Sequence, residues 1–282
     1  MLRPTQFNQS ILSSPAIALS HTKFPALSKS SNAKLVIIHG LFGSKRNWRT
    51  MAKNFSQKLN VEVFTLDLRN HGDSPHSSVF NYSAMAKDVE EFIEKNKLEN
   101  VTLLGHSMGG KVAMTVALRQ QSPLSRLVVV DSAPMRLGLS LDFAKFLERM
   151  KEIEKLQLTQ QSQADILLRD IAQDLSVRQF LLTNLRWDNS KKQYRFQIPL
   201  DILHDSLNEV REFPYMPGEA SYARPTLFIA GRRSRHRVDE KHHLLKRFFP
   251  QSRVSALDTG HWVQVEKPDE FFHVVADFIE NT

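Results

Sequence analysis

Short apolar runs without polar alternation recur along the chain and predict strands that are buried on both faces. The clearest are residues 34–39 (KLVIIH), 61–66 and 101–104. Such runs are typical of parallel sheets that helices cover on both sides. We expect further strands at 127–130, 226–229 and 253–257, and residues 16–24 alternate partly, as a short edge strand does.

Segments with a helical period separate these strands. Residues 82–97 place Met85, Val89, Phe92 and Ile93 on one stripe, and Ser83 is the expected N-cap of that helix. Helices are also expected at 47–59, 110–121 and 268–279. Strands that alternate with helices predict an α/β fold with a mostly parallel, doubly covered sheet and right-handed crossovers.

Polar and glycine-rich loops follow four of the predicted strands. They read HGLFG, DLRNHGDSP, GHSMG and DSAP. Functional groups of parallel sheets gather at the carboxyl ends of the strands, so we expect all four loops at one edge of the sheet.

Residues 134–222 interrupt the alternation of strands and helices. Helical segments are expected at 141–156, 163–175 and 177–185, and an aromatic and basic stretch follows at 186–196. No part of this segment has the pattern of a central strand. Because the sheet pattern resumes afterwards, we expect one domain, residues 16–282, with 134–222 inserted as a helical cap over the active edge.

Composition excludes several classes of protein. The chain of 282 residues has no cysteine, hence no disulfide framework and no thiolate site, and no apolar run long enough to span a bilayer. The net charge of +8 comes from residues 1–61, which hold nine basic and no acidic side chains. Without a basic stripe or a nucleic-acid-binding motif, this charge does not indicate nucleic-acid binding.

The first fifteen residues, MLRPTQFNQSILSSP, contain hydroxyl and amide side chains, one arginine and no acid. Mitochondrial presequences share this composition. We therefore predict that residues 1–15 are a presequence and that the protein is mitochondrial, although a single arginine is sparse for this purpose.

The motif Gly105-His106-Ser107-Met108-Gly109 joins a predicted strand to a predicted helix. The G-x-S-x-G spacing permits a sharp, strained turn on which the serine hydroxyl stands clear of the sheet. Small residues in the following helix allow it to pack close to the strands. A purely structural turn is the alternative, but the strand and helix on either side favour Ser107 as a nucleophile.

A serine nucleophile needs a general base, and eleven histidines compete for that role. His261 follows the last predicted strand in a Gly-His turn, late in the chain as a Ser-Asp-His order requires. Eight of the other ten histidines have other interpretations: loop residues that fix the backbone (His39, His71, His106), solvated residues (His236, His242, His243) and helix residues (His204, His273).

The orienting acid has two candidates. After the penultimate strand, where many proteins of this design carry the acid, the sequence has Ser234 instead, and Asp239 lies further along. Asp131 ends the strand next to that of Ser107 and points to the same edge. We choose Asp131 and keep Asp239 as the alternative.

The developing oxyanion needs two hydrogen-bond donors. One is the backbone N–H of Met108, directly after the nucleophile, and the second is assigned to the N–H of Leu41, with Phe42 as the alternative. This chemistry requires no cofactor and no metal, and we predict none.

Taken together, HGLFGS with Asn47-Trp48, DLRNHGDSPH, GHSMGGKVAM, VVVDSAP and GHWVQVEKP resemble the mitochondrial abhydrolase family of the α/β-hydrolase superfamily, which includes fungal ethanol acetyltransferases and related serine esterases. The resemblance covers nearly the whole chain. It implies that Ser107, Asp131 and His261 are nucleophile, acid and base, and it favours a mitochondrial location. One departure is the strongly basic loop at 232–237.

The predicted activity is acyl transfer through an acyl-enzyme. The resemblance implies that the donor is a small acyl ester or an acyl-CoA thioester and the acceptor is water or an alcohol, so that the protein is an esterase or thioesterase and forms acetate esters from acetyl-CoA. The arginines at 232–237 are interpreted first as a solvated charged surface. The alternative for these arginines is that they attract the phosphates of an acyl-CoA. The alternative is a non-catalytic binding protein that keeps the fold and stabilises a mitochondrial partner.

Overall fold

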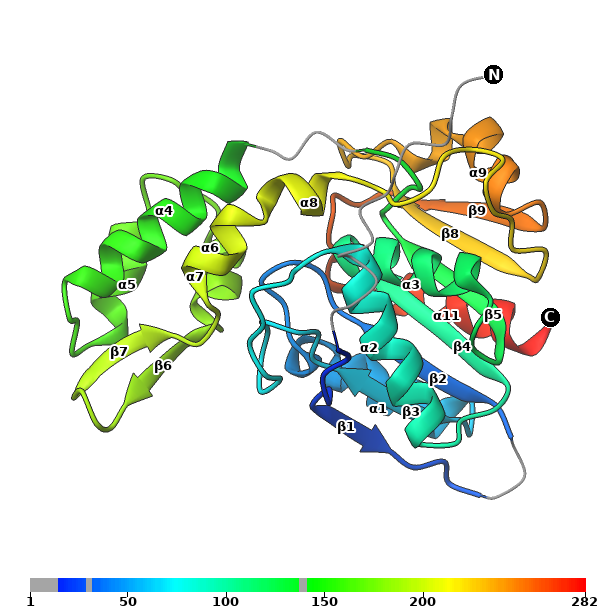
Figure 1. Cartoon of the computed structure of the whole chain (residues 1–282), viewed down its shortest axis with the longest axis horizontal. Coiled ribbons are helices and arrows are strands. Elements are labelled where there is room, and N and C mark those ends of the chain that lie inside the picture. The colour runs from blue at the N-terminus through cyan, green and yellow to red at the C-terminus, as the bar shows by residue number, and fades with distance from the viewer. Residues whose placement is uncertain (1–14, 29–31, 137–140) are drawn as a thin grey trace.

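The protein is built on one seven-stranded sheet, seen in a computed structural model that describes residues 15–28, 32–136 and 141–282 (Figure 1). The sheet has the order β1-β3-β2-β4-β5-β8-β9. All neighbours are parallel except β1, which pairs antiparallel with β3 at the edge. The strands are β1 (His21–Phe24), β2 (Lys34–Ile38), β3 (Glu62–Leu66), β4 (Val101–His106), β5 (Leu124–Val130), β8 (Thr226–Gly231) and β9 (Ser252–Leu257). The predicted α/β fold with a mostly parallel sheet is confirmed.

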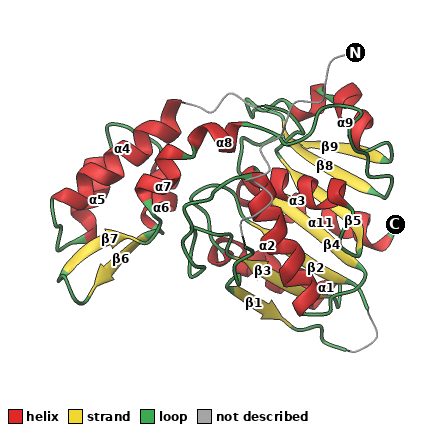
Figure 2. Cartoon of the chain, in the orientation of Figure 1, coloured by secondary structure: helices red, strands yellow, loops and turns green. Residues whose placement is uncertain are grey.

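Helices cover both faces of this sheet (Figure 2). Alternate strand residues belong to different cores: Val36 and Ile38 pack with α2 and α3, whereas Leu35 and Ile37 pack with α1 and α11. The absence of polar alternation in these strands follows from this double covering. The helices on the two faces are α2 (Tyr82–Lys95), α3 (Met108–Arg119) and α9 (His242–Phe248) on one, and α1 (Arg49–Lys58) and α11 (Pro268–Glu280) on the other.

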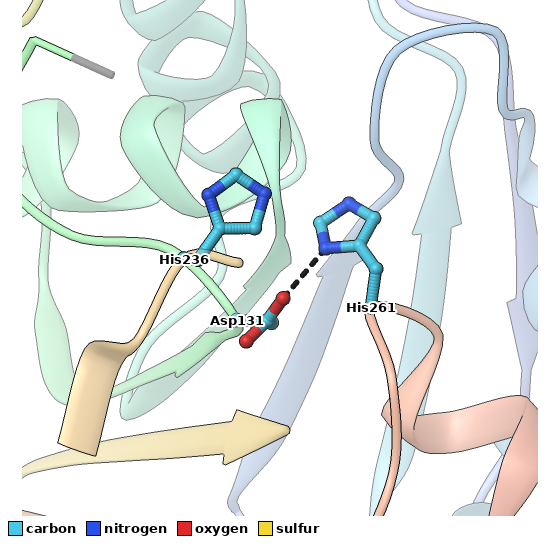
Figure 3. Close-up of side chains that lie close together, drawn as sticks. All are labelled: Asp131, His236 and His261. Carbon is cyan, nitrogen blue, oxygen red and sulfur yellow. Dashed lines mark hydrogen bonds and ion pairs between the residues drawn. The ribbon is translucent and has the colours of Figure 1, made fainter. Parts of the chain in front are cut away.

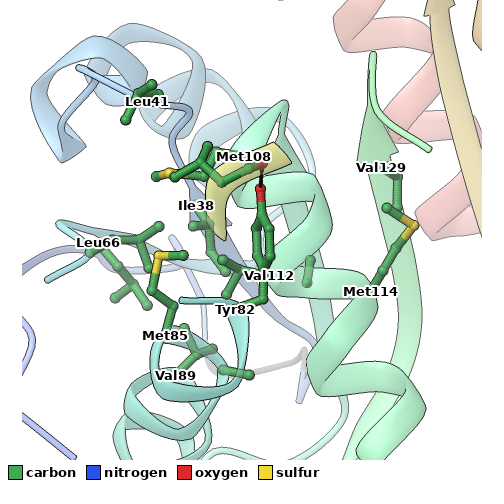
Figure 4. Close-up of a cluster of buried hydrophobic side chains, with 14 of the residues drawn as sticks. Ile38, Leu41, Leu66, Tyr82, Met85, Val89, Met108, Val112, Met114 and Val129 are labelled. Carbon is green, nitrogen blue, oxygen red and sulfur yellow. Dashed lines mark hydrogen bonds between the residues drawn. The ribbon is translucent and has the colours of Figure 1, made fainter. Parts of the chain in front are cut away.

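One core lies between α2, α3 and the sheet and includes Met108, the first residue of α3 (Figure 4). Met85 and Val89 of α2 and Val112 of α3 are buried there against Ile38 of β2. The cap of α2 differs from the prediction: Asn81, not Ser83, accepts the N–H of Ala84 at 2.9 Å.

The described residues between β5 and β8 contribute no strand to the central sheet. Their helices and a two-stranded hairpin lie to one side of the sheet in Figure 1. They are α4 (Leu141–Lys155), α5 (Gln161–Leu168), α6 (Leu175–Leu182), α7 (Leu200–Asp205), α8 (Leu207–Arg211) and the hairpin β6 (Leu185–Asp188) and β7 (Gln193–Phe196). The helix expected at 163–175 stops at Leu168, and the aromatic stretch at 186–196 forms most of the hairpin.

Short elements complete the chain: η2 (Lys45–Trp48), η3 (Val238–Glu240) and α10 (Val263–Glu266). Among the described residues, no helix combines the length and the apolar character needed to cross a bilayer. The predicted presequence, residues 1–15, lies outside the described residues except for Pro15.

Candidate active site

Ser107 stands on a strained turn between β4 and α3. Its φ of 55° and ψ of −117° lie in a region that side-chain-bearing residues rarely adopt. The turn needs its two glycines, because a Cβ on Gly105 would lie 2.1 Å from the Gly109 carbonyl oxygen, and one on Gly109 would lie 2.3 Å from the His39 carbonyl oxygen. The turn is therefore the sharp strand-to-helix elbow that the motif predicts.

Asp131 and His261 are brought into direct contact. His261 Nδ1 lies 2.6 Å from Asp131 Oδ2, and the aspartate side chain is fully buried at the end of β5. Asp239, the alternative acid, lies in η3, and no hydrogen bond or ion pair in the described residues joins it to His261. The carboxylate thus fixes the imidazole with its proton on Nδ1 and leaves Nε2 as an acceptor.

Ser234 occupies the position after β8 where an acid was expected. Its hydroxyl donates to Asp131 Oδ2 at 2.5 Å, and the N–H of Gly231 donates to Oδ1 at 3.2 Å. A carboxylate at 234 would face that of Asp131, which is unfavourable in a buried site. The serine instead supports the acid contributed by the neighbouring strand.

Burial shifts the pKa values of both Asp131 and His261. It raises the pKa of the Asp131 carboxyl, whereas the hydrogen bond from Ser234 opposes that rise. Burial, followed by the positive charge of Arg235, lowers the pKa of His261 to about 4. His261 is therefore neutral near pH 7, which is the form that can accept a proton.

One cavity of about 440 Å³ is lined by both Ser107 and His261, and residues of the inserted segment also line it. Phe143 and Phe146 of α4 and Phe180 of α6 give this cavity a largely apolar wall. Ser107 and the acyl group of a substrate can meet in this cavity.

The loop after β2 provides the second candidate oxyanion donor. Leu41 and Met108 both line the cavity, and Gly40 lies so close to the elbow that an added Cβ would be 3.2 Å from Ser107 Cβ. The N–H of Phe42 donates to His71 Nε2 at 3.2 Å. Because the Phe42 donor is already used, the geometry favours Leu41.

Loop histidines hold the backbone around this site. His39 Nδ1 donates to the Gly40 carbonyl at 2.7 Å, and its Nε2 accepts the N–H of Leu68 at 3.0 Å. His106 Nε2 donates to the carbonyl of His261 at 2.9 Å. This last bond connects the loop of His261 to His106, the residue before Ser107. Burial lowers the pKa of His106 to about 3, so its imidazole donates this bond in the neutral form.

The interpretation of His236 as a solvated residue is wrong. The side chain is half-buried, and its ring centroid lies 4.7 Å from that of His261 (Figure 3). The turn after β8, closed by the Arg237 N–H on the Ser234 carbonyl at 3.3 Å, folds His236 back toward the site. A run of basic residues gave no signal of this reversal.

Lys111 is a second residue that sequence reasoning missed. It lies on α3, is buried, and donates to the carbonyls of Arg211 and Glu212 at 2.7 and 2.8 Å. Tyr82 adds a hydrogen bond from its hydroxyl to the carbonyl of Val210 at 2.7 Å. The elbow helix therefore holds the end of the inserted segment, where α8 leads back to the sheet.

Comparisons with known proteins agree with this architecture. A family model described as alpha/beta hydrolase fold matches residues 34–268. The chain is 39% identical to the "Probable alcohol acetyltransferase" of Saccharomyces cerevisiae, over 87% of this chain and 77% of that protein. It is 37% identical to the "sn-1-specific diacylglycerol lipase ABHD11" of Danio rerio, over 89% of this chain and 80% of that protein.

A solved structure, that of a "Marine microorganism esterase", superposes with a TM-score of 0.86 at 28% identity, covering 93% of this chain and all of the other. The match of the family model and the identities above 30% over most of the chain lead to the same assignment. The protein belongs to the α/β-hydrolase family, in the abhydrolase group that contains acetyltransferases and esterases.

Proposed function

We propose that this protein is a serine-dependent acyl-transfer enzyme with Ser107 as nucleophile, His261 as base and Asp131 as orienting acid. The observation that carries the proposal is the 2.6 Å contact of His261 Nδ1 with the buried Asp131, in a cavity that the strained Ser107 also lines. A buried carboxylate that holds a neutral imidazole, in a cavity that an elbow serine also lines, supplies the groups that this chemistry needs.

In the first step, Ser107 Oγ attacks the carbonyl carbon of an ester or thioester while His261 Nε2 takes its proton. The backbone N–H groups of Met108 and Leu41 stabilise the oxyanion, and Asp131 stabilises the imidazolium. The imidazolium then gives its proton to the departing alcohol or thiol. In the second step, water or an alcohol takes the acyl group from Ser107 by the same transfers in reverse.

The proposal also concerns the identity of the acyl donor and of the acyl acceptor. The name of the yeast relative supports transfer of an acetyl group to an alcohol, and the name of the marine neighbour supports ester hydrolysis. The basic loop at 232–237 is a weaker argument for acyl-CoA, because Arg233 is paired with Asp258 at 2.8 Å and Glu266 at 3.2 Å.

The apolar cavity favours a second candidate substrate class, the glycerolipid esters suggested by the zebrafish relative. A volume of about 440 Å³, with aromatic side chains from α4 and α6, exceeds the needs of an acetyl group. Rates with p-nitrophenyl esters of increasing acyl length separate the two: a maximum at acetate supports acetyl transfer, and a maximum at longer chains supports a lipid substrate.

Incubation of the purified protein with p-nitrophenyl acetate, and with acetyl-CoA in the presence and absence of ethanol, tests the proposal. We expect release of p-nitrophenol, and ethyl acetate when ethanol is present. Ser107→Ala should abolish both products and labelling by a fluorophosphonate probe. A wild-type protein that releases no product and takes no label would instead support the alternative, a non-catalytic binding protein.

We also propose a mitochondrial location, on the composition of residues 1–15. A fluorescent fusion of the full chain should reach mitochondria, and a fusion that lacks residues 2–15 should not. Equal distribution of the two fusions would contradict the proposal.

A further inference from the structure

Three side chains with metal-binding atoms meet at the carboxyl edge of the sheet. Asp131 follows β5, His236 lies between β8 and η3, and His261 follows β9 (Figure 3). One carboxylate oxygen and one nitrogen from each ring all lie within 4.8 Å of one another. The acyl-transfer chemistry uses Asp131 and His261 but assigns nothing to His236.

The donor set is one that divalent zinc binds in proteins. Two imidazoles and one carboxylate, with a further position left open, form a common arrangement around Zn²⁺. Bonds of about 2.0–2.1 Å to a tetrahedral ion place donor atoms about 3.4 Å apart. Asp131 Oδ2 and His261 Nδ1, at 2.6 Å, lie closer than this and would have to separate by about 0.8 Å, while the His236 nitrogen, within 4.8 Å of both, would have to approach. Rotation of the two imidazole side chains about their torsions can supply both movements.

Hydrogen bonds from neighbouring residues orient Asp131 and the backbone of His236. Ser234 donates its hydroxyl to Asp131 at 2.5 Å and accepts the backbone N–H of His236 at 3.2 Å, so one residue connects two of the three donors. Gly231 holds the second carboxylate oxygen at 3.2 Å. Such supporting hydrogen bonds orient ligands in metal sites. His236 and His261 also line the catalytic cavity, toward which the open position would face.

We propose that Asp131, His236 and His261 bind Zn²⁺ and that this binding switches the catalytic site off. The metal takes the place of the proton on His261 Nδ1. The imidazole stays neutral, its single proton is then carried by Nε2, and Nε2 can no longer accept the proton of Ser107. The ion is thus a reversible inhibitor and not a cofactor. The effect of Zn²⁺ on activity rests on the proposed function, whereas the binding of Zn²⁺ to the three side chains does not.

Binding is measured first, on the full chain, because it needs no activity. Titration with ZnCl₂ by calorimetry, and with CoCl₂ by visible absorption, should give one site per chain and the intense spectrum of four-coordinate Co²⁺. His236→Phe keeps an aromatic ring but removes a donor, and it should weaken binding by about tenfold or more. The exposed His243 gives the matched control, His243→Phe, which should bind as the wild type does.

Inhibition is measured next, as hydrolysis of p-nitrophenyl acetate relative to each variant's own metal-free rate. Zn²⁺ should inhibit the wild type and His243→Phe, and EDTA should restore the activity of both. His236→Phe should require at least about tenfold more Zn²⁺ for the same degree of inhibition. Thermal unfolding checks that His236→Phe is folded, and His236→Gln replaces it if it is not.

Each outcome decides the question. Equal Zn²⁺ affinity and equal inhibition of the wild type and the His236 variants would overturn the three-residue site, as would the absence of Co²⁺ and Zn²⁺ binding at millimolar concentrations. A protein that binds Co²⁺ through His236 but hydrolyses no ester would retain the site and refute the proposed function. Binding without inhibition would overturn the switch.

Discussion

His261 Nδ1 lies 2.6 Å from Asp131 Oδ2, although 130 positions separate the two residues in the chain. The strand order explains the contact, because β5 lies next to β8, which lies next to β9, and both residues follow the carboxyl ends of their strands. An acid one strand away from its usual position can therefore still reach the imidazole.

Replacing this acid should be far more damaging than replacing its rival. Asp131→Asn removes the charge that stabilises the imidazolium and disturbs the tautomer of His261, so kcat should fall by about 10²- to 10⁴-fold. Asp239→Asn is the matched control and should stay near the wild-type rate. Steady-state hydrolysis of p-nitrophenyl acetate measures both, and the reverse ranking would move the acid to Asp239.

Ser234→Ala should lower kcat by about tenfold, because the buried Asp131 carboxylate loses a donor at 2.5 Å. The loss raises the pKa of Asp131 further, so the activity of Ser234→Ala should also fall at a higher pH than that of the wild type. Ser234→Thr keeps the hydroxyl and should recover most of the rate. Equal kcat values for Ser234→Thr and Ser234→Ala would show that the hydroxyl does not position Asp131.

The acid limb of kcat/KM should lie well below pH 6.5, because burial and Arg235 lower the pKa of His261 to about 4 and only the neutral imidazole is active. Arg235→Gln removes a positive charge that disfavours the imidazolium. The pKa therefore rises, and the limb moves to higher pH. Arg237→Gln, whose arginine pairs with Glu240 at 2.5 Å, serves as the control and should leave the limb in place.

Lys111 should make the stability of the protein depend on pH in the alkaline range. Burial lowers the pKa of this amine to about 7, below its unfolded value of about 10.4. Between these values the unfolded chain binds more protons, so the free energy of unfolding rises with pH. Lys111→Met should lack this rise, as urea unfolding of both proteins at pH 7 and pH 10 can measure.

Lys111→Met should also destabilise the fold by about 1–3 kcal/mol at pH 7, because the carbonyls of Arg211 and Glu212 lose their donor. Lys95→Met, at an exposed ion pair, should change stability little. Equal losses in the two variants would show that the buried Lys111 amine does not hold the inserted segment.

Much of the fold follows from the sequence because its signals are local. Uninterrupted apolar runs such as that at β2 indicate a doubly covered strand, and the glycines around Ser107 indicate a turn that other residues cannot form. The hairpin of β6 and β7 is not predicted from the sequence, because the mixed aromatic and basic stretch 186–196 has no clear period of two. Its turn does carry a local signal, Asp188-Asn189-Ser190, whose aspartate accepts the N–H of Ser190 at 2.9 Å.

The sequence by itself determined the sheet, the elbow and the edge at which the polar loops meet, since periodicity and turn chemistry depend on neighbouring residues. The sequence favoured Asp131 as the acid, and the tertiary structure decided between it and Asp239. The tertiary structure alone showed that Ser234 supports Asp131, that His236 turns into the site and that Lys111 holds the end of α8. Each of these depends on how separate loops converge at the sheet edge, and such distances between loops leave no mark on the local pattern of the chain.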